Sequence, residues 1–235
     1  MKRGLIIVIT ILATLGAKAQ MNNPYVDDKI VHFGFSLGMN FMTYGITDSE
    51  EIINGEVYHA RVSHLMPGFQ VGFITDVRLC RYLNLRFTPG LEFSSRTITY
   101  KTESGKEVKS PDFGNTVDVL SIPITVPLYL KFSAQREKNY RPYVIAGGGF
   151  SYNVSRDRDK PVLNKPWDYF VSVGVGVDLY LRWFKLCPEI KYQIGFADLI
   201  TPVSDRPELA KHNQFYTSSI KRMTTRMLTI SFNFE

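Results

Sequence analysis

Apolar and polar residues alternate along most of this chain, and the alternation is clearest over residues 169–196. Up to Trp183 the apolar side chains stand at odd positions, and from Phe184 onward they stand at even positions. A strict period of two is typical of a β-strand with one apolar face. Residues that face each other across a tight hairpin with an even-numbered loop have index numbers of opposite parity. The change of parity therefore predicts a β-hairpin whose apolar side chains all lie on one side.

Six further stretches alternate in the same way: 30–41, 65–77, 83–94, 119–132, 143–154 and 226–235. Together with the hairpin they make eight strands, joined by connections that are alternately long and short. The predicted long connections cover 42–63, 95–116, 155–168 and 198–221. Transmembrane barrels have an even number of strands, short periplasmic turns and long external loops. The pattern predicts an all-β fold, an eight-stranded antiparallel up-and-down transmembrane β-barrel.

A soluble eight-stranded barrel is the alternative, with its apolar face turned inward. The strands are longer than the usual five or six residues, and about 9–11 are needed to cross a membrane. Charged residues on the polar face would also fit a soluble barrel poorly. The second and third strands both have odd apolar positions, so we expect an odd-length turn or a bulge between them.

The first 20 residues, MKRGLIIVITILATLGAKAQ, have the layout of a secretory signal peptide. Lys2 and Arg3 precede an apolar stretch over 5–15, and Ala17-Lys18-Ala19 provides an A-x-A cleavage site. We therefore expect residues 1–19 to be removed and 20–235 to form one barrel domain in the outer membrane, in contact with its lipid. No run of 18 apolar residues follows the predicted cleavage site, which argues against a transmembrane helix.

Composition adds little to this interpretation. The formal net charge is +6 and the mean hydropathy is −0.09. Alternating strands are half polar, so a near-neutral mean is compatible with membrane residence. Removal of the three basic residues of the signal peptide takes the charge from +6 to +3. No run of lysine or arginine indicates nucleic acid as a partner.

The residues that most often carry chemistry show no recognisable site. Cys80 and Cys187 are expected to be free thiols, and the four histidines stand at no zinc-binding spacing. We therefore expect no metal and no cofactor. A lipid-modifying barrel enzyme would need a histidine and a serine together near one loop end, with an acid to orient the histidine. His59, His64 and His212 are the candidates, but we expect no enzymatic activity.

Seven charged residues are predicted to face the interior of the barrel: Arg86, Glu92, Lys131, Asp178, Glu189, Lys191 and Arg226. An eight-stranded barrel is just wide enough for side chains to fill it. Opposite charges inside it would pair, because a buried unpaired charge is costly. We expect a network of ion pairs, with a proton or solute path as the alternative. Parity leaves open whether Asp178 faces Lys191 or Glu189, because a shift of two residues in the pairing of the strands leaves the parity pattern unchanged.

Two prolines stand in the predicted fourth strand. Pro123 and Pro127 each lack a backbone donor, and residues of equal parity turn their backbone groups toward the same neighbouring strand. Both missing hydrogen bonds thus fall on one seam of a closed barrel. A bulge or a water molecule could satisfy the neighbouring carbonyls. The alternative is a weakened seam that makes lateral contact with a partner.

Several stretches resemble a known family. HFGFSLGMNF, SIPITVPLYLKF, RPYVIAGGGFSYNV and GVGVDLYLRWFKLCPEIKYQIGFADL are similar to the outer-membrane β-barrel superfamily common in Bacteroidetes. DDKIVHFGFSLGMNF and ISFNFE more particularly resemble the PorT family of the type IX secretion system. The resemblance implies a non-enzymatic part in exporting proteins with C-terminal sorting domains, with other secretion components as partners. A structural or surface-interaction barrel without a secretion role is the alternative.

Overall fold

The structure is a computed structural model, and it describes residues 22, 26–49, 52–53, 56–102, 112–156 and 160–235. The predicted signal peptide, 1–19, lies outside the described residues. The described residues form twelve strands: β1 (Val31–Asp48), β2 (Ile52–Ile53), β3 (Glu56–Leu65), β4 (Gly68–Arg78), β5 (Leu83–Phe87), β6 (Gly90–Thr102), β7 (Thr116–Ser121), β8 (Pro123–Ser133), β9 (Tyr140–Asn153), β10 (Trp167–Tyr180), β11 (Lys185–Gly195) and β12 (Ile220–Phe234). The short helices are η1 (Val26–Asp28), η2 (Val203–Asp205), η3 (Lys211–Asn213) and α2 (Gln214–Ser218).

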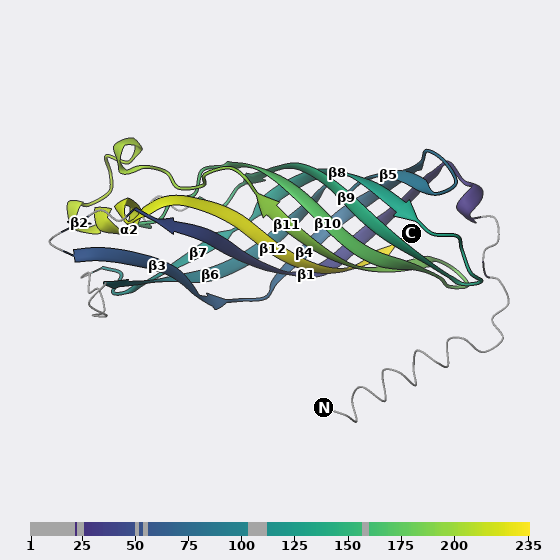
Figure 1. The fold of residues 1–235 in the computed structure, drawn as a ribbon, viewed down its shortest axis with the longest axis horizontal. Coiled ribbons are helices and arrows are strands. Elements are labelled where there is room, and N and C mark those ends of the chain that lie inside the picture. Colours follow the sequence, from purple (N-terminus) through teal and green to yellow (C-terminus); the bar gives the residue numbers. More distant parts are fainter. Residues whose placement is uncertain (1–21, 23–25, 50–51, 54–55, 103–111, 157–159) are drawn as a thin grey trace, which may run out of the picture.

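The strands form a closed antiparallel barrel. The hydrogen-bonded order is β1-β12-β11-β10-β9-β8-β5-β4, and β4 pairs with β1 to complete the ring. Figure 1 shows the strands winding obliquely around one long axis, with the C-terminus and η1 toward the same end. Three short turns, over 79–82, 134–139 and 181–184, lie at that end, which we call the turn end. The opposite end, which carries the long connections, is the loop end.

The barrel wall has eight segments that run along its length, and we call each of them a stave. Five staves are single strands, and three of the predicted strands are each divided in two. The second corresponds to β3 and β4, the third to β5 and β6, and the fourth to β7 and β8. Facing residues of the third and fourth staves keep one register from Leu83↔Phe132 to Thr99↔Thr116. The fold class from the sequence is therefore confirmed, and the higher strand count reflects local breaks together with the two-residue β2.

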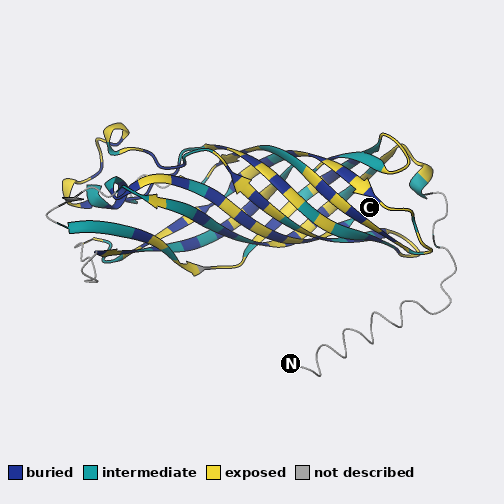
Figure 2. Ribbon diagram, viewed as in Figure 1, coloured by how far each residue is buried: buried dark blue, intermediate teal, exposed yellow. Residues whose placement is uncertain are grey.

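Burial alternates along the strands as the sequence pattern predicts. Figure 2 shows that buried and exposed residues alternate along the strands in the middle of the barrel. The exposed set is the apolar one, so Val171, Val173 and Val175 of β10 are each about half exposed. Trp167 and Tyr169 lie exposed at one end of β10, and Trp183 and Phe184 lie in the turn beyond its other end. An apolar outer band with aromatic residues at both margins is typical of a barrel in lipid.

The predicted hairpin over 169–196 is present with the expected parity. Phe170 faces Gly195 and Tyr180 faces Lys185, so all facing residues differ in parity. Between β4 and β5 the facing residues instead share parity, as in Val77↔Leu85, because the last facing pair, Arg78↔Asn84, encloses the five residues 79–83. No bulge interrupts this pairing. Of the two expectations for this connection, the odd-length turn is correct.

The long connections contain more regular structure than the alternation predicts. The stretch 42–63, expected to be an acidic loop, contains the end of β1 and most of β3. Similarly, β6 continues to Thr102 and β12 begins at Ile220. Through these extensions, β3, β6 and β7 continue the barrel wall toward the loop end (Figure 1). Among the described residues, no helix is long and apolar enough to cross a membrane.

The prediction that Arg226 faces the interior is wrong. Arg226 is exposed, and so are Leu228 and Ile230, which share its even parity on β12. Buried Met227 and Thr229 occupy the inward positions of this strand. Arg226 stands opposite Ile194 at the end of β11 that is nearer the loop end. An outward arginine at this level can extend its guanidinium away from the hydrocarbon while its stem covers apolar surface.

Candidate functional site

Charged side chains fill the interior of the barrel near the turn end. Four basic and four acidic residues form this ionic cluster, and each side chain is at most 12% exposed. Its members are Arg86, Lys131, Lys185, Lys191, Asp76, Asp178, Glu189 and Glu235. Equal numbers of the two signs leave the ionic cluster formally neutral. Burial of so many charges is tolerable only because they pair.

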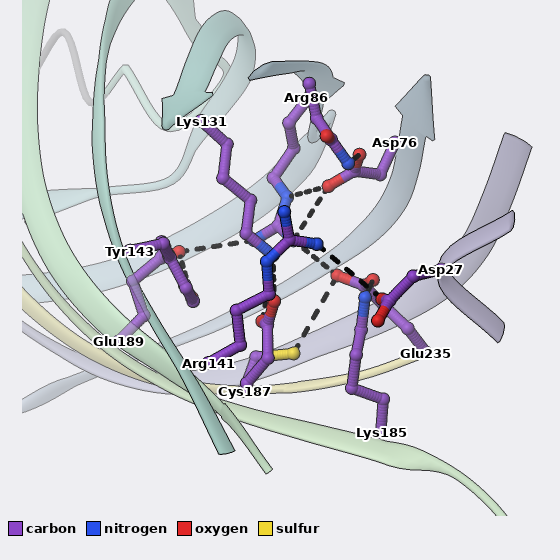
Figure 3. Close-up of polar contacts among 12 residues, drawn as sticks. Asp27, Asp76, Arg86, Lys131, Arg141, Tyr143, Lys185, Cys187, Glu189 and Glu235 are labelled. Atoms are coloured by element: carbon purple, nitrogen blue, oxygen red, sulfur yellow. Dashed lines mark hydrogen bonds and ion pairs between the residues drawn. The ribbon is translucent and has the colours of Figure 1, made fainter. Parts of the chain in front are cut away.

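Arg86 is the hub of the ionic cluster (Figure 3). Its guanidinium lies 2.9 Å from Asp76, 3.3 Å from Glu189 and 2.5 Å from Glu235. These three carboxylates come from β4, from β11 and from the residue after β12. A planar guanidinium carries five donors, so it can hold several carboxylates at once. Arg86 thus connects the wall of the barrel across its interior.

Three lysines complete the ionic cluster, and one of them, Lys185, lies 2.5 Å from Glu235. Lys131 places its ammonium 2.8 Å from both carboxylate oxygens of Asp178. Lys191 contacts Glu189 at 2.9 Å, and the hydroxyl of Tyr143 donates to the same carboxylate at 2.7 Å. Across the hairpin, Glu189 faces Gly176 and Lys191 faces Gly174. Asp178 therefore faces neither of the two residues that parity had left open.

Two glycines make room for these side chains. A methyl group on Gly176 would lie 2.4 Å from the ring of Tyr143, and one on Gly174 would lie 2.7 Å from the stem of Lys191. Both distances are well inside van der Waals contact. In the VGVGV stretch of β10, the small inward residues are thus a steric requirement of the large polar side chains opposite them.

The segment before β1 closes the turn end. Asp27 of η1 accepts a hydrogen bond from Tyr180 at 2.7 Å and pairs with Arg136 at 3.3 Å and Arg141 at 3.7 Å. The backbone N–H of Asn22 also donates to the side chain of Asn139, in the turn before β9, at 2.8 Å. This arrangement, which we call the N-terminal cap, joins the 134–139 turn to the ends of β9 and β10 at the turn end.

Glu92 lies inside the barrel but apart from the ionic cluster. It is 6% exposed, and its Oε2 has no hydrogen-bond partner among the described residues. Glu92 lines two cavities of about 30 Å³ each, one of which also reaches Lys191. Each cavity has room for one or two water molecules. The interior here is polar and narrow, and these cavities are far too small to make an open pore.

At the loop end the interior is filled mainly by apolar side chains. This apolar plug comprises Tyr44, Ala60, Ile98, Tyr100, Val117, Val119, Val162, Leu199, Ile200, Tyr216, Ile220 and Met223, all buried. Its residues come from five strands, from α2 and from the connections at 160–166 and 196–219. Tyr100 and Tyr216 meet edge to face, with ring centroids 4.8 Å apart. The interior is thus occupied at both ends.

The seam predicted at Pro123 and Pro127 lies between β8 and the β5–β6 stave. The N–H of Thr88 donates to the carbonyl of Pro127, whereas the backbone N–H and C=O of Ile122 both turn toward β9. Odd residues of β8 therefore face β5 and β6, and both missing donors fall on that seam. The register is continuous there, so no bulge compensates for them.

Two of the candidate histidines, His59 and His212, each pair with a different carboxylate. His59 pairs with Asp48 at 2.9 Å and His212 with Asp112 at 2.6 Å, so the recorded partner of each is a carboxylate. Cys80 and Cys187 are free, one exposed and one buried. Within the described ranges, no group of three or more His, Cys, Asp or Glu side chains is arranged to hold a metal ion.

Six of the seven predicted interior charges thus lie inside the barrel, and five of them belong to the ionic cluster. The predicted network omitted Asp76, Lys185 and Glu235, which also belong to the ionic cluster. Asp76 stands at an inward position of its predicted strand, and Lys185 and Glu235 have the inward parity of theirs. The N-terminal cap had no such signal, since residues 22–28 have no period of two.

A match to a protein-family model agrees with this architecture. No curated protein matches the chain significantly. Among solved structures, Neisserial surface protein A shares 10% identity with a TM-score of 0.43, covering 87% of this chain and 98% of its own. The outer membrane protein OprG from Pseudomonas aeruginosa shares 11% identity with a TM-score of 0.47, covering 87% and 93%. A family model, described as an outer membrane protein beta-barrel domain, matches residues 18–201. The chain therefore belongs to the outer membrane β-barrel domain family.

Proposed function

We propose that this outer-membrane protein is a non-enzymatic and non-conducting barrel that acts as an accessory subunit in protein export. The filled interior supports a non-conducting role, because the ionic cluster and the apolar plug occupy its two ends. A polypeptide in transit could not pass through such a barrel. Its contribution would come from its surfaces, by contact with the components that carry the cargo.

The likeness of DDKIVHFGFSLGMNF and ISFNFE to the PorT family supports type IX secretion as the export route. The test is deletion in the source organism, complemented by the wild-type chain. Unprocessed proteins with C-terminal sorting domains should accumulate in the periplasm and disappear on complementation. Normal export in the deletion strain would reject the secretion role.

We propose the seam at Pro123 and Pro127 as the place of lateral contact with a partner subunit. Because Pro123 and Pro127 have no backbone N–H, the carbonyl groups that face them on the β5–β6 stave lack their usual backbone hydrogen-bond donors. The double variant Pro123→Thr/Pro127→Thr restores both donors. It should raise heat stability and reduce co-purification of the partner. Unchanged stability and unchanged association would discard the idea.

A structural or surface-interaction barrel without a secretion role is the second candidate. The folded loop end favours it, since the apolar plug and the β3–β6–β7 sheet hold an ordered external surface. The same deletion separates the two candidates, because export would then be normal. Lipid A mass spectra from that strain test the enzyme alternative, and we expect them to be unchanged.

A further inference from the structure

A groove of about 520 Å³ opens on the outside of the barrel toward the loop end. Three arginines line it: Arg61 of β3 and Arg222 and Arg226 of β12. All three are exposed, and the side chain of Arg61 is 65% exposed. They come from strands far apart in the sequence, so the barrel itself assembles this cationic groove.

The arginines are held in defined positions. Arg222 donates to the backbone carbonyl of Phe196 at 2.9 Å. The guanidinium of Arg226 lies across β1 at Gly45, where an added methyl group would be 3.0 Å from its Nε. Arg61 pairs with Asp48 at 3.0 Å, and this carboxylate also holds His59. The three guanidinium groups carry three positive charges and Asp48 carries one negative charge, so the cationic groove has an excess of two positive charges.

The level of the cationic groove points to lipid rather than to a soluble ligand. Phe196, 54% exposed, lines it, and the N–H of Phe196 donates to the carbonyl of Tyr169 in the aromatic margin of the apolar band. Ile46 and Val62 supply further apolar lining. The groove is therefore cationic and apolar at once, at the depth where lipid headgroups meet the hydrocarbon.

We infer that the cationic groove binds the phosphate groups of a phosphorylated glycolipid of the outer leaflet. Guanidinium groups hold phosphate through two parallel hydrogen bonds, which makes arginine the preferred partner. Arg222 and Arg226 take the phosphate, and Phe196 packs against the adjoining acyl chains. This inference is independent of the proposed role in export, because it concerns only the barrel and its lipid.

The test uses the full chain purified in detergent, with binding of bisphosphorylated lipid A measured by native mass spectrometry. The double variant Arg222→Gln/Arg226→Gln should weaken binding roughly thirtyfold, at about a factor of five for each lost cation. Arg222→Lys/Arg226→Lys keeps the charges and should recover part of the affinity. The matched control is Arg81→Gln/Arg182→Gln, which removes two exposed arginines at the turn end and should leave binding unchanged.

The competing occupants give different results. Lipid A that lacks its phosphates should have the same weak affinity for the wild type and for the Arg222→Gln/Arg226→Gln variant. Equal binding of the two lipids by the wild type, or an unweakened double Gln variant, would overturn the inference. Inorganic phosphate that competes at equal concentration would show a simple anion site, and this too would overturn it. Absence of lipid A binding by the wild type would leave the groove to a protein partner and reject the lipid.

Discussion

Toward the short turns the interior of this barrel is filled by charged side chains, whereas toward the long loops it is filled mainly by apolar ones. The ionic cluster is built on regular strands and relies on pairing, with Arg86 in contact with three carboxylates. The apolar plug draws on loops and α2 and relies on burial of surface, as at Met223 and Tyr216. One cylinder is thus closed by two kinds of interaction, which should respond differently to substitution.

The largest effect is expected from Arg86→Met, which leaves Asp76, Glu189 and Glu235 buried without their shared cation. Removing one partner of a buried ion pair costs about 3–5 kcal/mol. Denaturant unfolding in micelles measures the loss. The matched control is Lys131→Met/Asp178→Leu, which removes both members of a pair and should cost less. An Arg86→Met barrel as stable as the wild type would mean that the ionic cluster is not held through Arg86.

A smaller effect is expected from Met223→Ala in the apolar plug. Truncating a fully buried methionine costs about 2–5 kcal/mol, and loops that can collapse around the gap favour the low end. The loss should appear as faster hydrogen exchange at the loop end, with the ionic cluster still protected. Leu228→Ala on the lipid face of the same strand is the control and should change little. An equal increase in hydrogen exchange at both ends would show that the ionic cluster and the apolar plug unfold as one unit.

How much the sequence could predict differs between the two regions. On strands, parity assigns each residue to a face, so it places Asp76 inside the barrel together with Arg86, Lys131 and Asp178. It does not fix which residues meet across the interior, because those contacts depend on register and on side-chain length. The apolar plug was not anticipated, since stretches without a period of two, such as 198–219, carry no signal for burial.

Arg226 shows where charge alone misleads. It was grouped with the interior because it is charged, although it shares the parity of outward Leu228. Near the margin of a membrane, an arginine can keep its stem on apolar surface and its guanidinium in the polar zone. Position along the strand therefore matters as much as residue type, and the same residue now contributes to the cationic groove.

The smallest effect concerns the surface of the loop end. Hydrogen bonds from His212 and Asn213 lower the pKa of the exposed carboxyl of Asp112. A carboxyl with a lowered pKa stabilises the fold above its unfolded pKa, and this contribution is lost as the pH falls through the folded value. Asp112→Asn should therefore lower the melting temperature slightly at pH 7, and this difference should shrink steadily as the pH falls below the unfolded value of about 3.9. A difference that does not shrink as the pH falls below that value would contradict this.

Conductance of the purified barrel in planar lipid bilayers tests the central claim most directly. With the ionic cluster and N-terminal cap at one end and the apolar plug at the other, the two cavities beside Glu92, of about 30 Å³ each, are too small to conduct ions. The wild-type protein should therefore insert without producing current steps, while a porin recorded under the same conditions does produce them. Reproducible steps of stable conductance from the wild-type barrel would contradict the account of a filled interior.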